Sequence, residues 1–220
     1  MKTILRDELV EMKESVIAYL ELALKISQES IRALKNNDTR LAIETIEISN
    51  GYHNKADKII DDFMFILTQN PLGKDLGRVV AYNAITKNVE SMIHNILTGS
   101  KFTIRSEGKL SKTSINRVAS IGKIFNDTLK FILDEIKKPS STQKDLYKVL
   151  EYYEDMKNKV EKVRKELYKS LSDKKEEDEI KERLFTFSVC EAIKRNSEKL
   201  VKICEHLMFV NNGKNHSLSV

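Results

Sequence analysis

Residues 84–93 read AITKNVESMI, and residues 192–201, which begin 108 positions later, read AIKRNSEKLV. Ala, Ile, Asn and Glu recur unchanged at the first, second, fifth and seventh places of the two stretches. A second pair repeats at an offset of 104, since residues 54–67 (NKADKIIDDFMFIL) match residues 158–171 (NKVEKVRKELYKSL). Two blocks in the same order and at nearly one spacing indicate an internal duplication. The chain is therefore predicted to be one unit built twice.

The composition favours helices. The 220 residues include only two prolines and seven glycines, with no Trp, which is typical of long helices joined by short connections. Apolar residues recur at three- and four-residue steps along most of the chain, as one buried face of a helix requires. Gly51 allows a bend in the second helix, and residues 98–110 are expected to join the two copies. The expected helices cover about 3–35, 39–68, 76–97, 111–138, 142–172 and 179–211.

These patterns predict an all-α fold of six helices, arranged as two similar three-helix bundles related by internal duplication. The expected boundaries are 1–105 for the first repeat, 106–212 for the second repeat and 213–220 for a flexible tail. Apolar stripes on long helices often bury themselves against a second copy, so a homodimer is expected as well.

Charge and cysteine content limit the classes of partner and the location. Residues 1–108 carry 14 basic and 15 acidic side chains, whereas residues 109–220 carry 24 and 18. The lysines alternate with glutamates, which is typical of solvated helix faces, so no nucleic-acid partner is expected.

Cys190 and Cys204 fit reduced core thiols. No apolar run approaches the roughly 20 residues that span a bilayer, and a cytoplasmic protein is expected.

The first copy contains a candidate metal site. His53, Asp57 and Asp61 follow one another at four-residue steps, and Glu90 and His94 form another four-residue pair on the next helix. Carboxylates and imidazoles that project from neighbouring helices can hold a transition metal such as Fe or Zn. The alternative is that all five are solvated groups on helix surfaces, and spacing alone leaves both interpretations open.

The second copy has lysines at the same places. Its equivalents of the five residues are Lys157, Glu161, Lys165, Glu198 and Lys202. Lys and Glu at four-residue steps form ion pairs along a helix, and these ammonium groups would occupy the space of a cation. Any metal is therefore expected in the first copy only.

No motif of an enzyme is present in the sequence. It contains no P-loop, no nucleophile elbow and no dinucleotide-binding glycine pattern. Three residues separate Glu90 from His94, whereas ferritin-like di-iron proteins use a Glu-x-x-His motif. No catalytic residue and no organic cofactor are predicted.

Two segments, together with the duplication, carry a family resemblance. Residues 69–78, QNPLGKDLGR, are similar to a Q-P-x-x-x-D-L-R turn, and residues 193–213, IKRNSEKLVKICEHLMFVNNG, are similar to a closing segment L-E-R-I-G-D-H-A-x-N-I-A-E-x-V-x-Y-x-x-x-G. Both patterns occur in the PhoU-like family of phosphate-uptake regulators, which the chain resembles over most of its length. The resemblance implies tandem three-helix bundles and a non-enzymatic regulator that contacts a phosphate transporter or its signalling partner at the membrane.

The resemblance also implies a metal motif, in which an acidic residue is followed by three other residues and then Asp. Glu90 and Glu198 keep the second acid, but Thr86 and Lys194 replace the first. The departure argues against a family-type metal cluster. The alternative function is a metal-binding helical sensor or storage protein that uses the first-repeat residues.

Overall fold

The computed structural model describes residues 2–107, 109–138, 143–172 and 177–212. These residues form α-helices joined by short connections, and no strand occurs among them, so the predicted all-α fold class is confirmed. The predicted tail at 213–220 lies outside the described residues. The helices are α1 (Lys2–Asn36), α2 (Thr39–Ser49), α3 (Tyr52–Thr68), α4 (Lys74–Arg105), α5 (Lys112–Lys137), α6 (Gln143–Ser172) and α7 (Glu177–Asn212).

The predicted second helix is broken at the glycine that was expected to bend it. Gly51 has a φ of +86°, a left-handed conformation that glycine adopts without the steric cost of a Cβ atom. The break separates α2 from α3, which together fill the place of one helix. Asp38 begins α2 as a side-chain cap, because its carboxylate accepts a hydrogen bond of 2.9 Å from the backbone N–H of Leu41, satisfying a donor that the first turn leaves unpaired.

The prediction of a junction over residues 98–110 was wrong for its first half, because α4 continues to Arg105. Gly99 lies inside the helix, where a Cβ atom would come within 2.8 Å of Ser30 Oγ on α1. This glycine allows two helices to approach closely and does not end one. The connection to α5 begins at Ser106, and Ser111 Oγ caps α5 by accepting from the N–H of Ser114.

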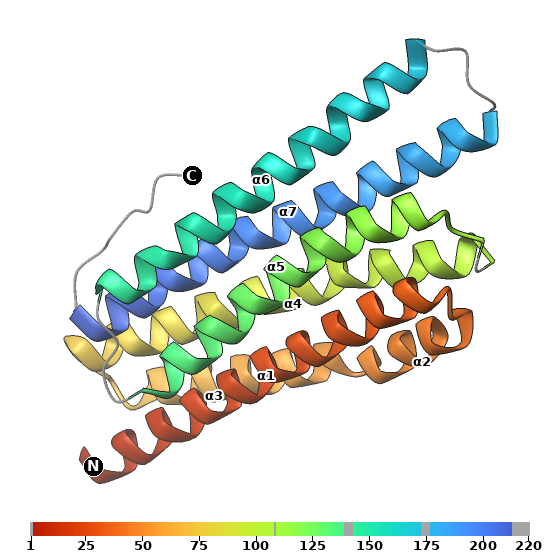
Figure 1. The fold of residues 1–220 in the computed structure, drawn as a ribbon. Helices are drawn as coiled ribbons and strands as arrows, with labels where there is room; N and C mark the ends of the chain where they lie inside the picture. The colour runs from red at the N-terminus through yellow and green to blue at the C-terminus, as the bar shows by residue number, and fades with distance from the viewer. Residues whose placement is uncertain (1, 108, 139–142, 173–176, 213–220) are drawn as a thin grey trace.

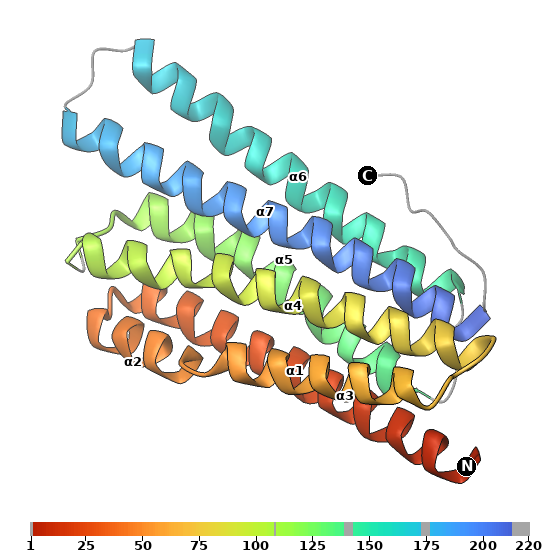
Figure 2. The same cartoon turned by 180° about the vertical axis from the view of Figure 1, so that it is seen from behind.

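The helices pack in a pattern that is the same for both halves (Figure 1). α1 packs on α4 and α5, and α7 packs on the same two helices. The α2–α3 pair covers α1 and α4 on one side, and α6 covers α5 and α7 on the other (Figure 2). Exchanging α1 with α5, α4 with α7, and α2–α3 with α6 leaves this pattern of contacts unchanged, as the duplication requires.

The two copies also bury the same positions. In α3 and α6, the buried pairs are Tyr52 and Met156, Ala56 and Val160, and Ile59 and Val163; in α4 and α7, they include Met92 and Leu200, Ile93 and Val201, and Ile96 and Cys204. The offsets are the 104 and 108 positions read from the sequence. One hydrophobic cluster contains buried residues from α1, α3, α4, α5, α6 and α7, so the two halves share a core.

Two further features concern membrane spans and disulfides. None of the helices in the described residues is long and apolar enough to cross a membrane. Cys190 and Cys204 are buried free thiols, not a disulfide.

Candidate functional site

His53 and Glu90 are the two members of the predicted metal set that the structure brings together. His53 lies in the first turn of α3, directly after the Gly51 break, and its Nδ1 is 2.7 Å from Glu90 Oε1 on α4. The side chains are 61% and 31% exposed respectively, so water screens the contact. Asp57, Asp61 and His94 are exposed. Within the described part of the chain, no three His, Cys, Asp or Glu side chains are close enough to share a metal ion.

Two tyrosines that the sequence interpretation missed complete the surroundings of Glu90. The ring of Tyr52 lies 3.8 Å from the imidazole of His53, centroid to centroid. Tyr19 on α1 is 1% exposed, and its hydroxyl has no hydrogen-bond partner in the described structure. Burial raises the pKa of Tyr19, and the negative charge of Glu90 raises it further. The sequence did contain a signal that Tyr19 is buried, because Tyr19 follows Val16 by three residues and so falls on the apolar stripe of α1.

The equivalent glutamate of the second half has lysine and tyrosine neighbours. Lys194 Nζ lies 3.7 Å from Glu198 Oε1 and 3.9 Å from Glu191 Oε2, one turn away on either side. The hydroxyl of Tyr153 on α6 donates to Glu198 Oε1 across 3.4 Å. The ammonium group of Lys194 therefore lies between the carboxylates of Glu191 and Glu198.

The predicted ion-pair partners in the second half were wrong. Lys157 pairs with Glu154 at 3.2 Å rather than with Glu161, and Lys202 pairs with Glu205 at 2.8 Å rather than with Glu198. Both observed pairs are three residues apart, a spacing that a helix brings together as readily as four. A lysine does lie beside the second-half glutamate Glu198, but it is Lys194 and not one of the three lysines expected there.

The residues at the first position of the family's metal motif do not fit a metal cluster. Thr86 is fully buried, and its hydroxyl donates to the backbone carbonyl of Tyr82 at 2.9 Å. Lys194 brings positive charge to the corresponding place in α7. A metal cluster of this kind needs a deprotonated carboxylate at this position. The Lys194 ammonium has no lone pair to offer, and the Thr86 hydroxyl is uncharged and already bonded to the Tyr82 carbonyl. A metal site built from His53, Asp57, Asp61, Glu90 and His94 remains a prediction, which elemental analysis of the purified chain can test.

The arrangement defines a class of protein, a tandem helical bundle whose two halves share one core. Residues 16–96 match the family model described as the PhoU domain. The fold of the whole chain is similar to the crystal structure of PhoU from Pseudomonas aeruginosa, with a TM-score of 0.87 and 18% identity over 95% of this chain and 99% of that one.

A second crystal structure is similar in fold to this chain. The phosphate transport system regulatory protein PhoU from Streptococcus pneumoniae superposes with a TM-score of 0.86 and 18% identity, covering 97% of this chain and 100% of that one. No curated protein sequence matches the chain. The resemblance to the PhoU-like family is confirmed by the domain match over residues 16–96 and by the fold over nearly all of the chain.

Proposed function

We propose that the chain is a non-enzymatic regulator of phosphate uptake, which acts by contact with a phosphate transporter or with the signalling partner of that transporter. The observation that carries this proposal is the PhoU fold along the full bundle, joined to the PhoU domain match. The protein named from Streptococcus pneumoniae is a regulatory protein of a phosphate transport system. We also propose a cytoplasmic location, with attachment to the membrane through the partner. The two buried free thiols accord with a reducing compartment.

Exposed apolar side chains supply surfaces for such contacts. One group, which we call the first patch, belongs to the end of α3, the following turn and the start of α4, and the second patch belongs to the end of α6 and the start of α7. These two sets of helix ends lie at opposite ends of the bundle (Figure 1). Met64 and Tyr168 occupy equivalent places in the duplication, as do Leu76 and Leu184. The first patch consists of Met64, Phe65, Leu72, Leu76 and Val80, and the second of Tyr168, Leu171, Leu184 and Phe185.

The two patches support contact with a partner because exposed apolar groups at matching positions of both copies would be buried on binding. Leu72 alone is 81% exposed, and burying a leucine side chain contributes about 2 kcal/mol. A dimer of the chain itself stays a prediction.

A pull-down from native membranes tests the proposal. The tagged chain should recover components of phosphate transport or phosphate sensing, and Leu76→Asp and Leu184→Asp should reduce recovery at least about tenfold, because each puts a charge into an interface. Ile43→Asp is the matched control, since Ile43 is a 47% exposed apolar residue on α2 outside both patches. Wild-type preparations that never contain such components would overturn the proposal.

A further inference from the structure

A small cavity lies where the two halves meet. It is bounded by α1 and α4 of the first half and by α5 and α7 of the second. Its volume is about 20 Å³, and a buried water needs about 10–15 Å³ on the same measure. Gly99 and Gly122 form part of the wall, and a Cβ atom at either would meet Ser30 or Ile31. The space is therefore the size of one water molecule.

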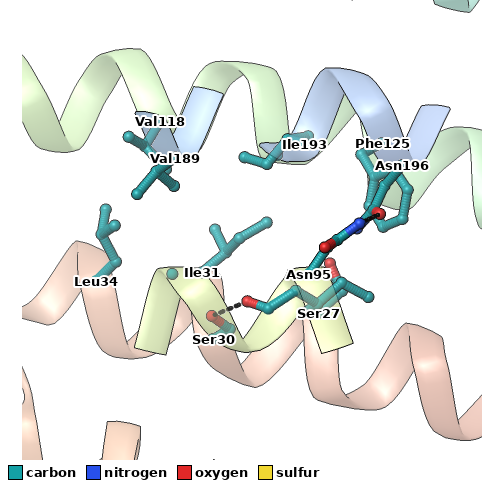
Figure 3. A pocket seen from close by; sticks show the side chains of 13 residues that line it. Ser27, Ser30, Ile31, Leu34, Asn95, Val118, Phe125, Val189, Ile193 and Asn196 are labelled. Atoms are coloured by element: carbon teal, nitrogen blue, oxygen red, sulfur yellow. Dashed lines mark hydrogen bonds between the residues drawn. The ribbon is translucent and has the colours of Figure 1, made fainter. Parts of the chain in front are cut away.

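Polar groups from three helices reach this space (Figure 3). Asn95 Nδ2 on α4 donates to Asn196 Oδ1 on α7 at 3.0 Å, and Asn196 Nδ2 donates to the backbone carbonyl of Met92 at 3.1 Å. A side-chain amide has two N–H donors and an oxygen with two lone pairs. These two bonds use one donor and one lone pair of Asn196, and the other donor and lone pair remain for a further partner.

Ser30 on α1 approaches from the other side. It is 3% exposed, and its Oγ accepts from Ser100 Oγ at 3.0 Å. Its own donor reaches the carbonyl of Ile96 at 3.5 Å, which is long for an O–H···O bond, where about 2.7–2.8 Å is usual. The hydroxyl hydrogen rotates freely, so Ser30 can donate instead to an acceptor in the cavity.

We propose that this cavity is a binding site for one ordered water molecule, hydrogen-bonded to Ser30 on α1 and to the Asn95–Asn196 pair on α4 and α7. A buried water typically makes about three hydrogen bonds, which these groups can provide. The water joins the first half to the second through side chains that are otherwise incompletely hydrogen-bonded. It holds α1 and α4 in register with α7 at the shared interface. The inference does not depend on the proposed function.

The rival occupant is an apolar one, because the remaining wall is made of aliphatic and aromatic side chains. Ile31, Leu34, Val118, Phe125, Val189 and Ile193 all line the space. Dry apolar cavities bind xenon, whereas polar cavities of this size hold water. The two possibilities make opposite predictions for a crystal of the protein under xenon pressure.

The first experiment is a pair of high-resolution crystal structures of the full chain, one in air and one under xenon. We expect a water peak within hydrogen-bond distance of Ser30 Oγ and of the Asn196 amide, and no xenon at that place. Xenon in the cavity, or a crystal without the water peak, would overturn the proposal.

The second experiment counts long-lived internal waters in solution by water ¹⁷O relaxation dispersion. Ser30→Val, which removes the hydroxyl and fills the space, should lose one long-lived water relative to wild type. Thr103→Val is the control, because Thr103 is fully buried and its hydroxyl donates only to the carbonyl of Gly99 on its own helix; it should keep the wild-type count. An equal loss in both variants would contradict the assignment. If Ser30→Val does not fold, the two crystal structures decide.

Discussion

At the scale of single residues, Glu90 and Glu198 show how one ancestral position came to have two sets of neighbours. Glu90 contacts the imidazole of His53, and Glu198 contacts the ammonium of Lys194 and the hydroxyl of Tyr153. Each carboxylate is engaged by side chains of the protein itself. The equivalence of the two glutamates was readable from the sequence, and His53 and Glu90 were placed in one candidate set. The partners Lys194 and Tyr153 of Glu198 were not predicted.

The Tyr19 hydroxyl is predicted to lower stability. It is buried without a hydrogen-bond partner in the described structure, and such a group loses its hydration without compensation. Tyr19→Phe should therefore raise the free energy of unfolding by about 1 kcal/mol, as measured by urea titration. Tyr153→Phe is the matched comparison and should lower it by about 1 kcal/mol, because that hydroxyl donates to Glu198. A destabilised Tyr19→Phe variant would mean that the hydroxyl is bonded in solution.

The two thiols are predicted to be inert in the native chain. Burial raises the pKa of Cys190 to about 12, and burial likewise raises the pKa of Cys204. The thiolate is the reactive form, and at about pH 8 both groups remain protonated. A thiol-reactive disulfide reagent should modify them more than about 100-fold more slowly in the native chain than in denaturant. Native rates close to the denatured ones would show that α7 opens readily.

At the scale of helices, the break between α2 and α3 was only half predictable. Gly51 pointed to a bend, but the lengths of α2 and α3 depend on how the pair wraps α1 and α4. Gly99 was expected in the junction between the copies, yet it lies inside α4, where the missing side chain gives room for Ser30. Gly122 lies inside α5, within the predicted helix, and gives room for Ile31 in the same way.

Replacing Gly51 tests the role of its backbone conformation. No atom lies within 4 Å of a Cβ built on Gly51, so only the left-handed φ of +86° opposes a side chain there. Gly51→Ala should lower the free energy of unfolding by about 1 kcal/mol, and Gly51→Asn should cost less, because asparagine tolerates this conformation. Both values come from denaturant unfolding. Equal stability of Gly51→Ala and wild type would show that α2 and α3 join into one helix in solution.

At the scale of the whole molecule, the duplication produced two halves that share one hydrophobic core. The strongest contacts between halves are made by α4 with α7 and by α1 with α5, and the hydrophobic cluster runs through both halves. Separating the halves would expose this shared apolar surface to water. The division at residues 105 and 106 therefore marks a repeat boundary in the sequence, and independent folding of each repeat is a separate question.

A fragment of residues 1–107 answers that question. We expect it to lose cooperative unfolding or to associate, because the faces of α1 and α4 that pack on α5 and α7 would be bare. Circular dichroism during urea titration, together with sedimentation, measures both. A monomeric fragment with a sharp transition would show that each repeat is a domain in its own right.

Much of the fold followed from local patterns. The offsets of 104 and 108 located the equivalent buried positions, and the apolar periods located most helix ends to within a few residues, because helix period is a property of short stretches. The exceptions are the break at Gly51 and the end of α4, which runs to Arg105 and not to residue 97. The candidate site followed less well. His53 and Glu90 meet, but Asp57, Asp61 and His94 remain exposed, since spacing within a helix does not fix which face turns toward a neighbouring helix.

The sequence by itself determined that this protein is a duplicated helical chain, because apolar periodicity and internal repetition can both be read from the order of the residues. Tertiary structure alone decided that the two copies share a core, that the charge of Glu90 acts on the buried Tyr19, and that Ser30, Asn95 and Asn196 line a small cavity. These features depend on how helices that are distant in the sequence are rotated and spaced. The packing of all the helices together sets that rotation and spacing.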